Sequence, residues 1–430
     1  MKVLLINYTD AGGGAAIAAF RITEALYNAG VNITMGVIQK KSEAPFVIEI
    51  PRKRKTTIAK TIIQLSRIIK KIYTRVLFPL SSLTKFRTTN NILHSINNSS
   101  IVDINWINNF DCDVVNLHWV GSDMLSIKDI SRINKPIVWT MHDSWPCCGA
   151  EHYQNILEND TRWKEGYFRS NKPKTTKGID ICRHVWCQKK KYLVNKKIHF
   201  VAPSNWQHDI LCSSALFNQN LCSVVPNIIP KKLFFKRDKD YLRSLFGISV
   251  KTKIIGFGAA ENLNDKNGRK GSYYLSKALK KLSHSGDYFL VVFGPQSNDF
   301  ITQIEIPHFI SGYIENPLFL SFLYNICDVI VCPSLIENLP NICLEALFCG
   351  VPSVAFDVGG ISDIVVHKKN GWLATPYNED ELAEGIEWCS EHKEELSQNC
   401  LEKAKNDFDA NKIIHDYISV YSDAINESFK

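Results

Sequence analysis

The sequence lacks long apolar runs. No stretch of its 430 residues approaches the about 20 consecutive apolar residues that a membrane-spanning helix needs. The N-terminal segment has one lysine and a short apolar run interrupted by polar residues, which does not fit a signal peptide. We therefore expect a cytoplasmic location. Hydrophobic residues make up 45% and charged residues 22% of the chain, which argues against wholesale disorder and predicts at least two hydrophobic cores at this length.

Cysteine is too sparse for a disulfide framework. The 13 cysteines are an odd number scattered over the whole chain, so we expect reduced thiols. Residues 147–187 nevertheless contain several cysteines and histidines that are potential metal ligands. The potential ligands there are Cys147, Cys148, His152, Cys182, His184 and Cys187. Their spacing matches no recognised zinc pattern, so we expect no metal.

Acidic residues are absent from residues 51–102, which contain eleven Lys or Arg. The rest of the chain has 40 basic and 43 acidic residues, so the net charge of +8 comes from this segment. Apolar residues recur at three- or four-residue steps over residues 57–80, as in a cationic amphipathic helix. Such a helix can simply cover a core, but the lack of acids favours contact of residues 51–87 with an anionic membrane surface or a lipid-diphosphate acceptor. The slightly acidic remainder argues against a nucleic-acid partner.

Alternating buried strands and helices predict an α/β protein with two doubly wound, Rossmann-like domains. The expected strands are 2–7, 114–117, 136–140 and 199–202, and then 253–258, 289–293, 329–332 and 353–356. The expected domains are residues 1–227 with the basic insertion at about 51–102, a linker at 228–250, residues 251–406, and a C-terminal helix at 407–430 that crosses back to the first domain. Alternation of this kind gives parallel sheets covered on both faces. Because ligands bind beyond the carboxyl ends of such strands, two facing domains predict a cleft between them.

The most informative motif lies between two buried strands of the second domain, at residues 334–352. Two acids, Glu337 and Glu345, are separated by seven residues, and Pro340 and Gly350 mark the start and end of a short helix. The N-terminus of that helix favours an anion such as a diphosphate. Either glutamate alone would more often be a solvated surface charge. The spacing of the pair, with Cys-Gly-Val-Pro and further glycines after it, is more specific.

Residues 311–373 resemble the donor-site signature of family 4 glycosyltransferases, which have the two-domain GT-B fold. In that family the first glutamate contacts the transferred sugar and the second binds the ribose of a nucleotide sugar. By this resemblance the two roles fall on Glu337 and Glu345. Backbone amides around residues 338–341 would face the sugar and the phosphates, so the donor-binding candidates there are Asn338, Leu339, Pro340 and Asn341.

Two cations, Arg269 and Lys270, lie between a strand that ends at Gly258 and the next helix. They suit a diphosphate leaving group, on which charge builds as the glycosidic bond breaks. The family has a lysine before a glycine, which Lys270 matches, and an arginine directly after the strand, where this chain has Ala259 and Ala260. Arg269 is a candidate substitute for that arginine. A solvated basic turn is the alternative.

Two further candidates lie in the first domain. Gly13 and Gly14 belong to a triple glycine before a helix, which is not the dinucleotide fingerprint and can serve packing alone. The family has a glycine-rich loop here that approaches the donor phosphates. His142 follows a buried strand; a lone histidine there is more often structural, but within its surroundings it looks like the family histidine that contacts the donor sugar.

The resemblance, which is closest to bacterial colanic acid and O-antigen enzymes, implies a retaining hexosyltransferase. We expect a UDP- or GDP-sugar donor, a lipid-linked oligosaccharide acceptor, no catalytic metal, and a peripheral position on the inner face of the cytoplasmic membrane. Glu337 and His142 are the catalytic candidates. Two alternatives are a sugar-nucleotide epimerase of the same fold and a non-catalytic, membrane-associated binding protein.

Overall fold

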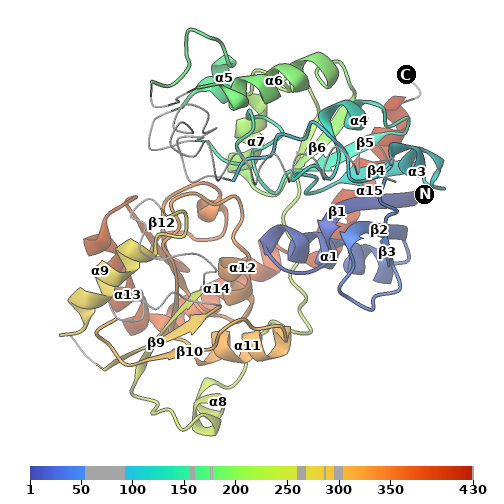
Figure 1. The fold of residues 1–430 in the computed structure, drawn as a ribbon. Helices are drawn as coiled ribbons and strands as arrows, with labels where there is room; N and C mark the ends of the chain where they lie inside the picture. Colours follow the sequence, from blue (N-terminus) through green and yellow to red (C-terminus); the bar gives the residue numbers. More distant parts are fainter. Residues whose placement is uncertain are drawn as a thin grey trace, which may run out of the picture.

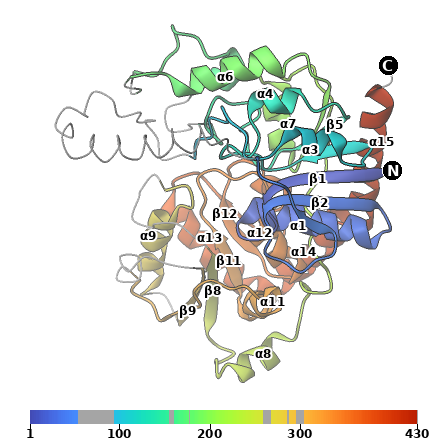
Figure 2. The ribbon, with the colours of Figure 1, turned by 45° about the vertical axis from the view of Figure 1, so that its right-hand side comes forward.

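The computed structural model describes residues 1–53, 93–154, 160–174, 176, 178–258, 268–284, 287–294 and 304–428. The predicted basic helix at residues 57–80 and the alanine pair at 259–260 lie outside these residues, as does most of the segment 51–87. Figure 1 shows two lobes, each built around its own sheet, and Figure 2 shows the same lobes after rotation.

The first sheet has seven parallel strands in the order β3-β2-β1-β4-β5-β6-β7. Its strands are β1 (Lys2–Thr9), β2 (Asn32–Gln39), β3 (Val47–Glu49), β4 (Val114–Leu117), β5 (Ile137–Thr140), β6 (Ile198–Ala202) and β7 (Cys222–Val224). Its helices are α1 (Gly14–Asn28), α3 (Ile104–Asn109), α4 (Ile127–Ser131), α5 (Arg162–Glu165), α6 (Ile181–Tyr192) and α7 (Asn205–Cys212). Neighbouring residues of a strand point to opposite faces, so Leu4 and Leu5 of β1 enter two different cores.

The second sheet has six parallel strands in the order β10-β9-β8-β11-β12-β13. Its strands are β8 (Lys253–Gly258), β9 (Tyr288–Phe293), β10 (His308–Ile310), β11 (Val329–Cys332), β12 (Ser353–Phe356) and β13 (Gly371–Ala374). The helices are α8 (Lys239–Leu245), α9 (Ser272–Leu282), α11 (Pro317–Ile326), α12 (Asn341–Phe348), α13 (Glu379–Glu391) and α14 (Lys393–Asp407). Helices α9 and α13 contribute to one core, and α11, α12 and α14 to the other. The prediction of an α/β fold with two parallel-sheet domains is confirmed.

The last helix, α15 (Ala410–Ser428), packs on the first domain. Its buried residues Tyr417 and Tyr421 share a core with β1 and α1. Asn116 Nδ2 of β4 donates a hydrogen bond to Tyr421 Oη at 2.8 Å. The chain therefore returns to its first lobe at the C-terminal end, beside β1 and β4 in Figure 1.

Most of the segment 228–250, expected as a linker, packs as part of the second domain, whereas Ile228 belongs to a core of the first. Phe234 and Leu242 are buried in the core of the second domain. Arg243, 0% exposed, donates to Asp328 Oδ2 at 2.7 Å and to the carbonyl of Ile326. Burial raises the pKa of Asp328, but Lys239 and Arg243 outweigh it and lower the pKa to about 2. Two of the basic residues that suggested a linker, Lys239 and Arg243, therefore pair with a buried carboxylate.

Among the described helices, none combines the length and apolar character needed to cross a bilayer.

Candidate active site

The strand order of the two sheets indicates where a ligand would bind in each domain. The order reverses between β1 and β4 in the first sheet and between β8 and β11 in the second. Ligands of such sheets bind at these reversals, beyond the carboxyl ends of the strands. The residues there form what we call the interdomain site: Gly12, Gly13, Gly14, His118, His142, Arg269, Lys270, Glu337, Asn338, Asn341 and Glu345.

Glu337 lies in the loop between β11 and α12 and is 7% exposed. Arg269 Nη1 is 2.9 Å from its Oε1, and Lys270 Nζ pairs with the same oxygen. The Ser334 hydroxyl donates to that oxygen at 3.3 Å. Burial would raise the pKa of Glu337, but the two cations outweigh it and lower the pKa to about 2. Glu337 is therefore a carboxylate at neutral pH and only accepts hydrogen bonds.

Glycines hold this loop and its cations in close contact. Gly271 has φ +65° at the start of α9, and a Cβ there would lie 1.7 Å from the carbonyl oxygen of Pro333. Gly359 has φ +61°, and a Cβ there would lie 1.8 Å from the carbonyl oxygen of Glu337. Only glycine fits both the left-handed conformation and the approach. The cations and the carboxylate are thus fixed by backbone packing as well as by charge.

Glu345, in α12, has partners different from those of Glu337. Arg21 Nη2 of α1, in the first domain, is 2.7 Å from Glu345 Oε1, and both side chains are more than 90% buried. Tyr324 Oη donates to Glu345 Oε2 at 2.7 Å. The Arg21 guanidinium also stacks over the Phe234 ring, 5.0 Å from its centroid. Glu345 is therefore the acidic half of a buried ion pair between the domains.

The start of α12 meets the glycine-rich turn of the first domain. Asn341 Nδ2 donates to the carbonyl of Gly14 at 3.2 Å. Gly13 precedes α1 with φ +86°, so the turn needs glycine at this point. Leu339, itself buried, offers its carbonyl to Asn227 Nδ2 at 3.5 Å. Pro340 caps the N-terminus of α12 in an extended conformation.

Asn338 joins the same loop to the first domain by two hydrogen bonds. Its Nδ2 donates to the carbonyl of Met141 at 2.8 Å, and its Oδ1 accepts from Ser204 Oγ at 2.7 Å. Asn338 is 4% exposed. The predicted residues Asn338 and His142 are therefore brought to adjacent positions, because Met141 precedes His142 in the chain.

His142 is half-buried and shares a hydrogen bond with His118, the two nitrogens Nε2 and Nδ1 lying 2.8 Å apart. Burial lowers the pKa of His142 to about 4, despite the opposing charge of Asp143. Burial also lowers the pKa of His118 well below its usual value. Both imidazoles are therefore neutral at pH 7, and His142 meets a ligand as a neutral hydrogen-bonding group.

Asp143, His152 and Ser95 form a hydrogen-bonded chain behind His142. His152 Nδ1 is 2.6 Å from Asp143 Oδ2, and His152 Nε2 is 2.7 Å from Ser95 Oγ. This resembles the order of a nucleophile, base and orienting acid. Ser95 is only 2% exposed, however, and it accepts the Ser122 N–H at 3.0 Å. With no access for a substrate, the chain of bonds fixes the loop that carries His142.

The sequence-based metal candidates do not come together as a set. Within the described residues, one group has metal-ligating atoms all within 4.8 Å of one another: His94, Glu151 and Cys182. Of the six potential ligands named from the sequence, only Cys182 belongs to this group. His152 is excluded because both of its ring nitrogens are already hydrogen-bonded.

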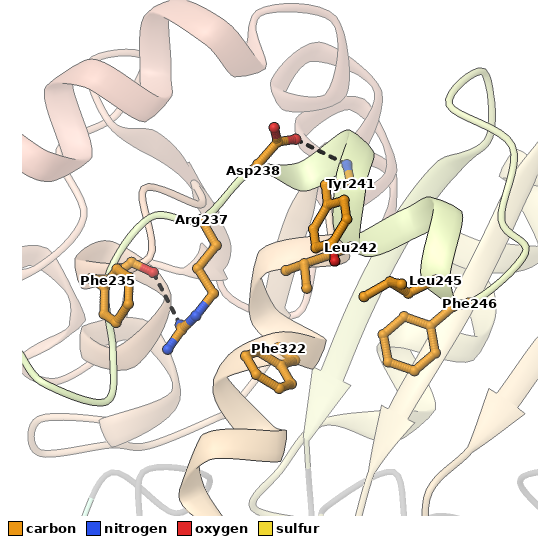
Figure 3. Close-up of a pocket in the computed structure, with 8 residues that line it drawn as sticks. All are labelled: Phe235, Arg237, Asp238, Tyr241, Leu242, Leu245, Phe246 and Phe322. Atoms are coloured by element: carbon orange, nitrogen blue, oxygen red, sulfur yellow. Dashed lines mark hydrogen bonds between the residues drawn. The ribbon is translucent and has the colours of Figure 1, made fainter.

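A groove on the second domain lies outside the interdomain site (Figure 3). It has a volume of about 590 Å³ and is lined by Phe235, Arg237, Asp238, Tyr241, Leu242, Leu245, Phe246 and Phe322. The Tyr241 N–H donates to Asp238 Oδ1 at 2.9 Å at the start of α8. None of the predicted site residues lines this groove, so we assign it no part in the site.

Sequence reasoning did not identify several residues that hold the interdomain site together. Arg21, Tyr324, Ser204 and Ser334 contact the predicted residues, and the Arg269 guanidinium lies 5.2 Å from the Tyr153 ring centroid across the domains. A local signal that could have found Arg21 is its place among the mostly small and apolar buried residues of α1. An arginine at such a position needs a partner.

Two parallel-sheet domains with this arrangement form the GT-B fold. The family model described as "Glycosyl transferases group 1" matches residues 263–407, which include Arg269, Lys270, Glu337 and Glu345. The solved structure of Anabaena HepE in complex with UDP and glucose has a TM-score of 0.63 and 17% identity, with 98% of this chain and 100% of that chain covered.

Two curated relatives are similar over part of their length. N-acetyl-alpha-D-glucosaminyl L-malate synthase of Bacillus anthracis is 26% identical over 47% of this chain and 54% of its own. The putative teichuronic acid biosynthesis glycosyltransferase TuaC of Bacillus subtilis is 31% identical over 33% of this chain and 36% of its own. The chain thus spans about a third to a half of the curated relatives it matches.

Proposed function

We propose that the chain is a retaining glycosyltransferase that moves a hexose from a nucleotide-diphosphate sugar to a lipid-linked oligosaccharide. The observation that carries the proposal is the ionised Glu337 beside Arg269 and Lys270, at the carboxyl end of β11. These residues lie within the segment that matches the glycosyl transferase family model. The UDP and glucose named in the HepE structure support a nucleotide-sugar donor.

The charges suggest how the reaction proceeds. When the bond between the anomeric carbon and the diphosphate breaks, its electron pair moves to the phosphate oxygen, where Arg269 and Lys270 stabilise the charge. The acceptor hydroxyl oxygen forms the new bond on the same face of the sugar, and its proton passes to the departing phosphate. The configuration is retained. No protein nucleophile is needed.

Glu337 and His142 position the sugar in this scheme. As a carboxylate, Glu337 accepts hydrogen bonds from sugar hydroxyls. His142, neutral and held by His118, offers one further hydrogen bond from the first domain. Glu345 accepts hydrogen bonds from the ribose hydroxyls, and each carboxylate oxygen has lone pairs beyond those used by Arg21 and Tyr324.

The finer biological assignment is synthesis of a bacterial surface polysaccharide of the O-antigen or exopolysaccharide type. The name of TuaC, which refers to teichuronic acid biosynthesis, supports a surface polysaccharide. The peripheral position on the inner membrane face rests on the basic composition of residues 51–87. We expect the donor to be a UDP- or GDP-sugar, without a catalytic metal.

A thermal-shift panel of UDP, GDP, dTDP and ADP, with their hexose conjugates, tests the proposal. One nucleotide family should raise the Tm of the wild type and of Glu384→Ala, an exposed control in α13, but not of Glu345→Ala. Absence of any shift, also with anionic vesicles present, contradicts the donor site. Conversion of the donor sugar without an acceptor, followed by NMR, would instead favour the epimerase.

A further inference from the structure

Three metal-ligating side chains meet in the first domain, away from the interdomain site. The nitrogen of His94, the carboxylate of Glu151 and the sulfur of Cys182 all lie within 4.8 Å of one another. We propose that these three residues bind a Zn²⁺ ion. Imidazole, carboxylate and thiolate are the three ligand types that zinc takes in proteins.

The backbone builds the first half of this site. The Ser95 N–H donates to the Ala150 carbonyl, and the His152 N–H donates to the Leu93 carbonyl. These two bonds flank an isolated antiparallel bridge between His94 and Glu151. In a pair of this kind the two residues share no hydrogen bond with each other, and their side chains are at the closest spacing that antiparallel strands allow. His94 and Glu151 are thus placed side by side.

The third ligand, Cys182, lies near the other two because α6 packs closely against the backbone at Gly149. Cys182 lies in the first turn of α6, two residues after the capping residue Asp180. A Cβ on Gly149 would lie 2.4 Å from the Cys182 carbonyl oxygen, so the helix start rests directly on the backbone just before Glu151. Glycine at 149 is what permits this approach. The three ligands therefore come from three segments that the fold holds in contact.

The burial of Glu151 is a second, independent observation that points to a cation. Glu151 is 4% exposed. Tyr167 Oη donates to its Oε1, while its Oε2 is buried and accepts no hydrogen bond. In the described part of the chain no lysine or arginine forms an ion pair with it. Arg162 and Lys189 lie close enough to interact with its charge, but Arg162 pairs with Asp160 and Asp180, and Lys189 Nζ donates to the carbonyls of Cys148 and Gly149. A buried carboxylate without a directly bound cation is unfavourable.

Zinc satisfies this charge. With Cys182 as thiolate, Glu151 as carboxylate and His94 neutral, the dication leaves the cluster with no net charge. Three protein ligands leave the fourth position of a tetrahedral zinc ion to a water molecule, which would enter on the side where His94 and Cys182 are half-buried. The ion would join residues 93–95, α6 and the loop that carries His142. The pattern of cysteine spacing could not predict this, because His94 and Glu151 are not in that pattern.

Metal analysis of the full-length protein, purified without chelator, tests the proposal. We expect about one zinc per chain in the wild type and at least about a tenfold loss of zinc in Cys182→Ser and His94→Ala. Cys187→Ser removes a half-buried thiol from the same helix outside the cluster and should keep its zinc. Substoichiometric zinc in the wild type after dialysis against Zn²⁺, or full zinc in Cys182→Ser, overturns the site.

A second measurement covers the case in which the ligand variants do not fold. Cobalt exchanged into the wild-type protein should give the near-ultraviolet absorption of a thiolate–cobalt bond, and the Cys187→Ser protein should give the same band. Bound cobalt without this absorption contradicts thiolate ligation. Neither measurement depends on glycosyl transfer, so its result is separate from that of the proposed function.

Discussion

The two domains contribute different kinds of polar group to the interdomain site. The second domain supplies charges, with Arg269, Lys270 and an ionised Glu337 in direct contact. The first supplies a glycine turn and two imidazoles that are neutral at pH 7. Under the proposed function, the second domain would stabilise the charged leaving group, and the first would add uncharged hydrogen bonds to the sugar that Glu337 also positions.

Arg21 departs from this pattern, because it is a charged residue of the first domain. Its substitution should have the largest effect on stability. Arg21 pairs with Glu345 across the domains, with side chains 9% and 6% exposed. Arg21→Met leaves a buried carboxylate with only Tyr324 as donor, so it should lower the free energy of unfolding by about 3–5 kcal/mol. Urea denaturation measures this.

An exposed ion pair provides the control for Arg21. Lys280 and Glu305 are 64% and 45% exposed, so Lys280→Met should cost about 0–1 kcal/mol. A double variant, Arg21→Met with Glu345→Gln, should recover part of the loss. Equal effects of Arg21→Met and Lys280→Met would mean that the domains are not held by this pair.

Substitution of Glu337 tests the charged groups that the second domain contributes. Glu337→Gln keeps the shape of the side chain but leaves Arg269 and Lys270 without its negative charge. Donor binding should be unchanged or tighter, while kcat for transfer falls by about 10²–10³-fold, the usual effect of removing one positioned polar group. Steady-state kinetics with the donor found by the thermal-shift panel measure both. Weaker donor binding with an unchanged kcat would assign Glu337 to binding alone.

The fold was largely predictable because buried parallel strands are short apolar runs between turns. The predicted strands 329–332 and 353–356 coincide with β11 and β12. Five of the described strands were not identified: β2, β3, β7, β10 and β13. Of these, β3, β7 and β10 have only three residues each and lie at an edge of a sheet. Segment 228–250 looked like a linker because its buried apolar residues are outnumbered by lysines and arginines. Two of these, Lys239 and Arg243, pair with the buried Asp328, which the sequence does not show.

The site was predictable where its residues are close in sequence and less so where they are far apart. The loop and helix from Glu337 to Glu345 are contiguous, so their spacing alone marked them. The partner of Glu345 lies 324 positions earlier, in a helix of the other domain, and no local pattern joins the two. Likewise, the pairing of His118 with His142 depends on how β4 and β5 lie side by side.

A smaller effect is expected from the uncharged link between the domains. Asn338→Ala removes the hydrogen bonds to the Met141 carbonyl and to Ser204. The loss should lower the free energy of unfolding by about 1–3 kcal/mol, because two buried groups lose their partner. Asn399→Ala, which removes an exposed hydrogen bond within the second domain, is the matched control and should cost less. If both cost the same, the contact of Asn338 with the first domain contributes little.

The smallest expected effect is that of mild acid on His142. Its pKa in the folded protein is about 4, below the value of about 6.5 in the unfolded chain, so the unfolded chain takes up the proton first as the pH falls. The stability from keeping His142 neutral is complete above about pH 6.5 and is lost progressively down to about pH 4. Transfer between pH 8 and pH 7 should therefore show no effect of His142 protonation. His142→Asn should flatten the fall of Tm between pH 6.5 and pH 4, whereas His415→Asn, at an exposed position, should not. A step in the transfer rate near pH 6.5 that His142→Asn abolishes would show instead that the first domain, too, works through a charge.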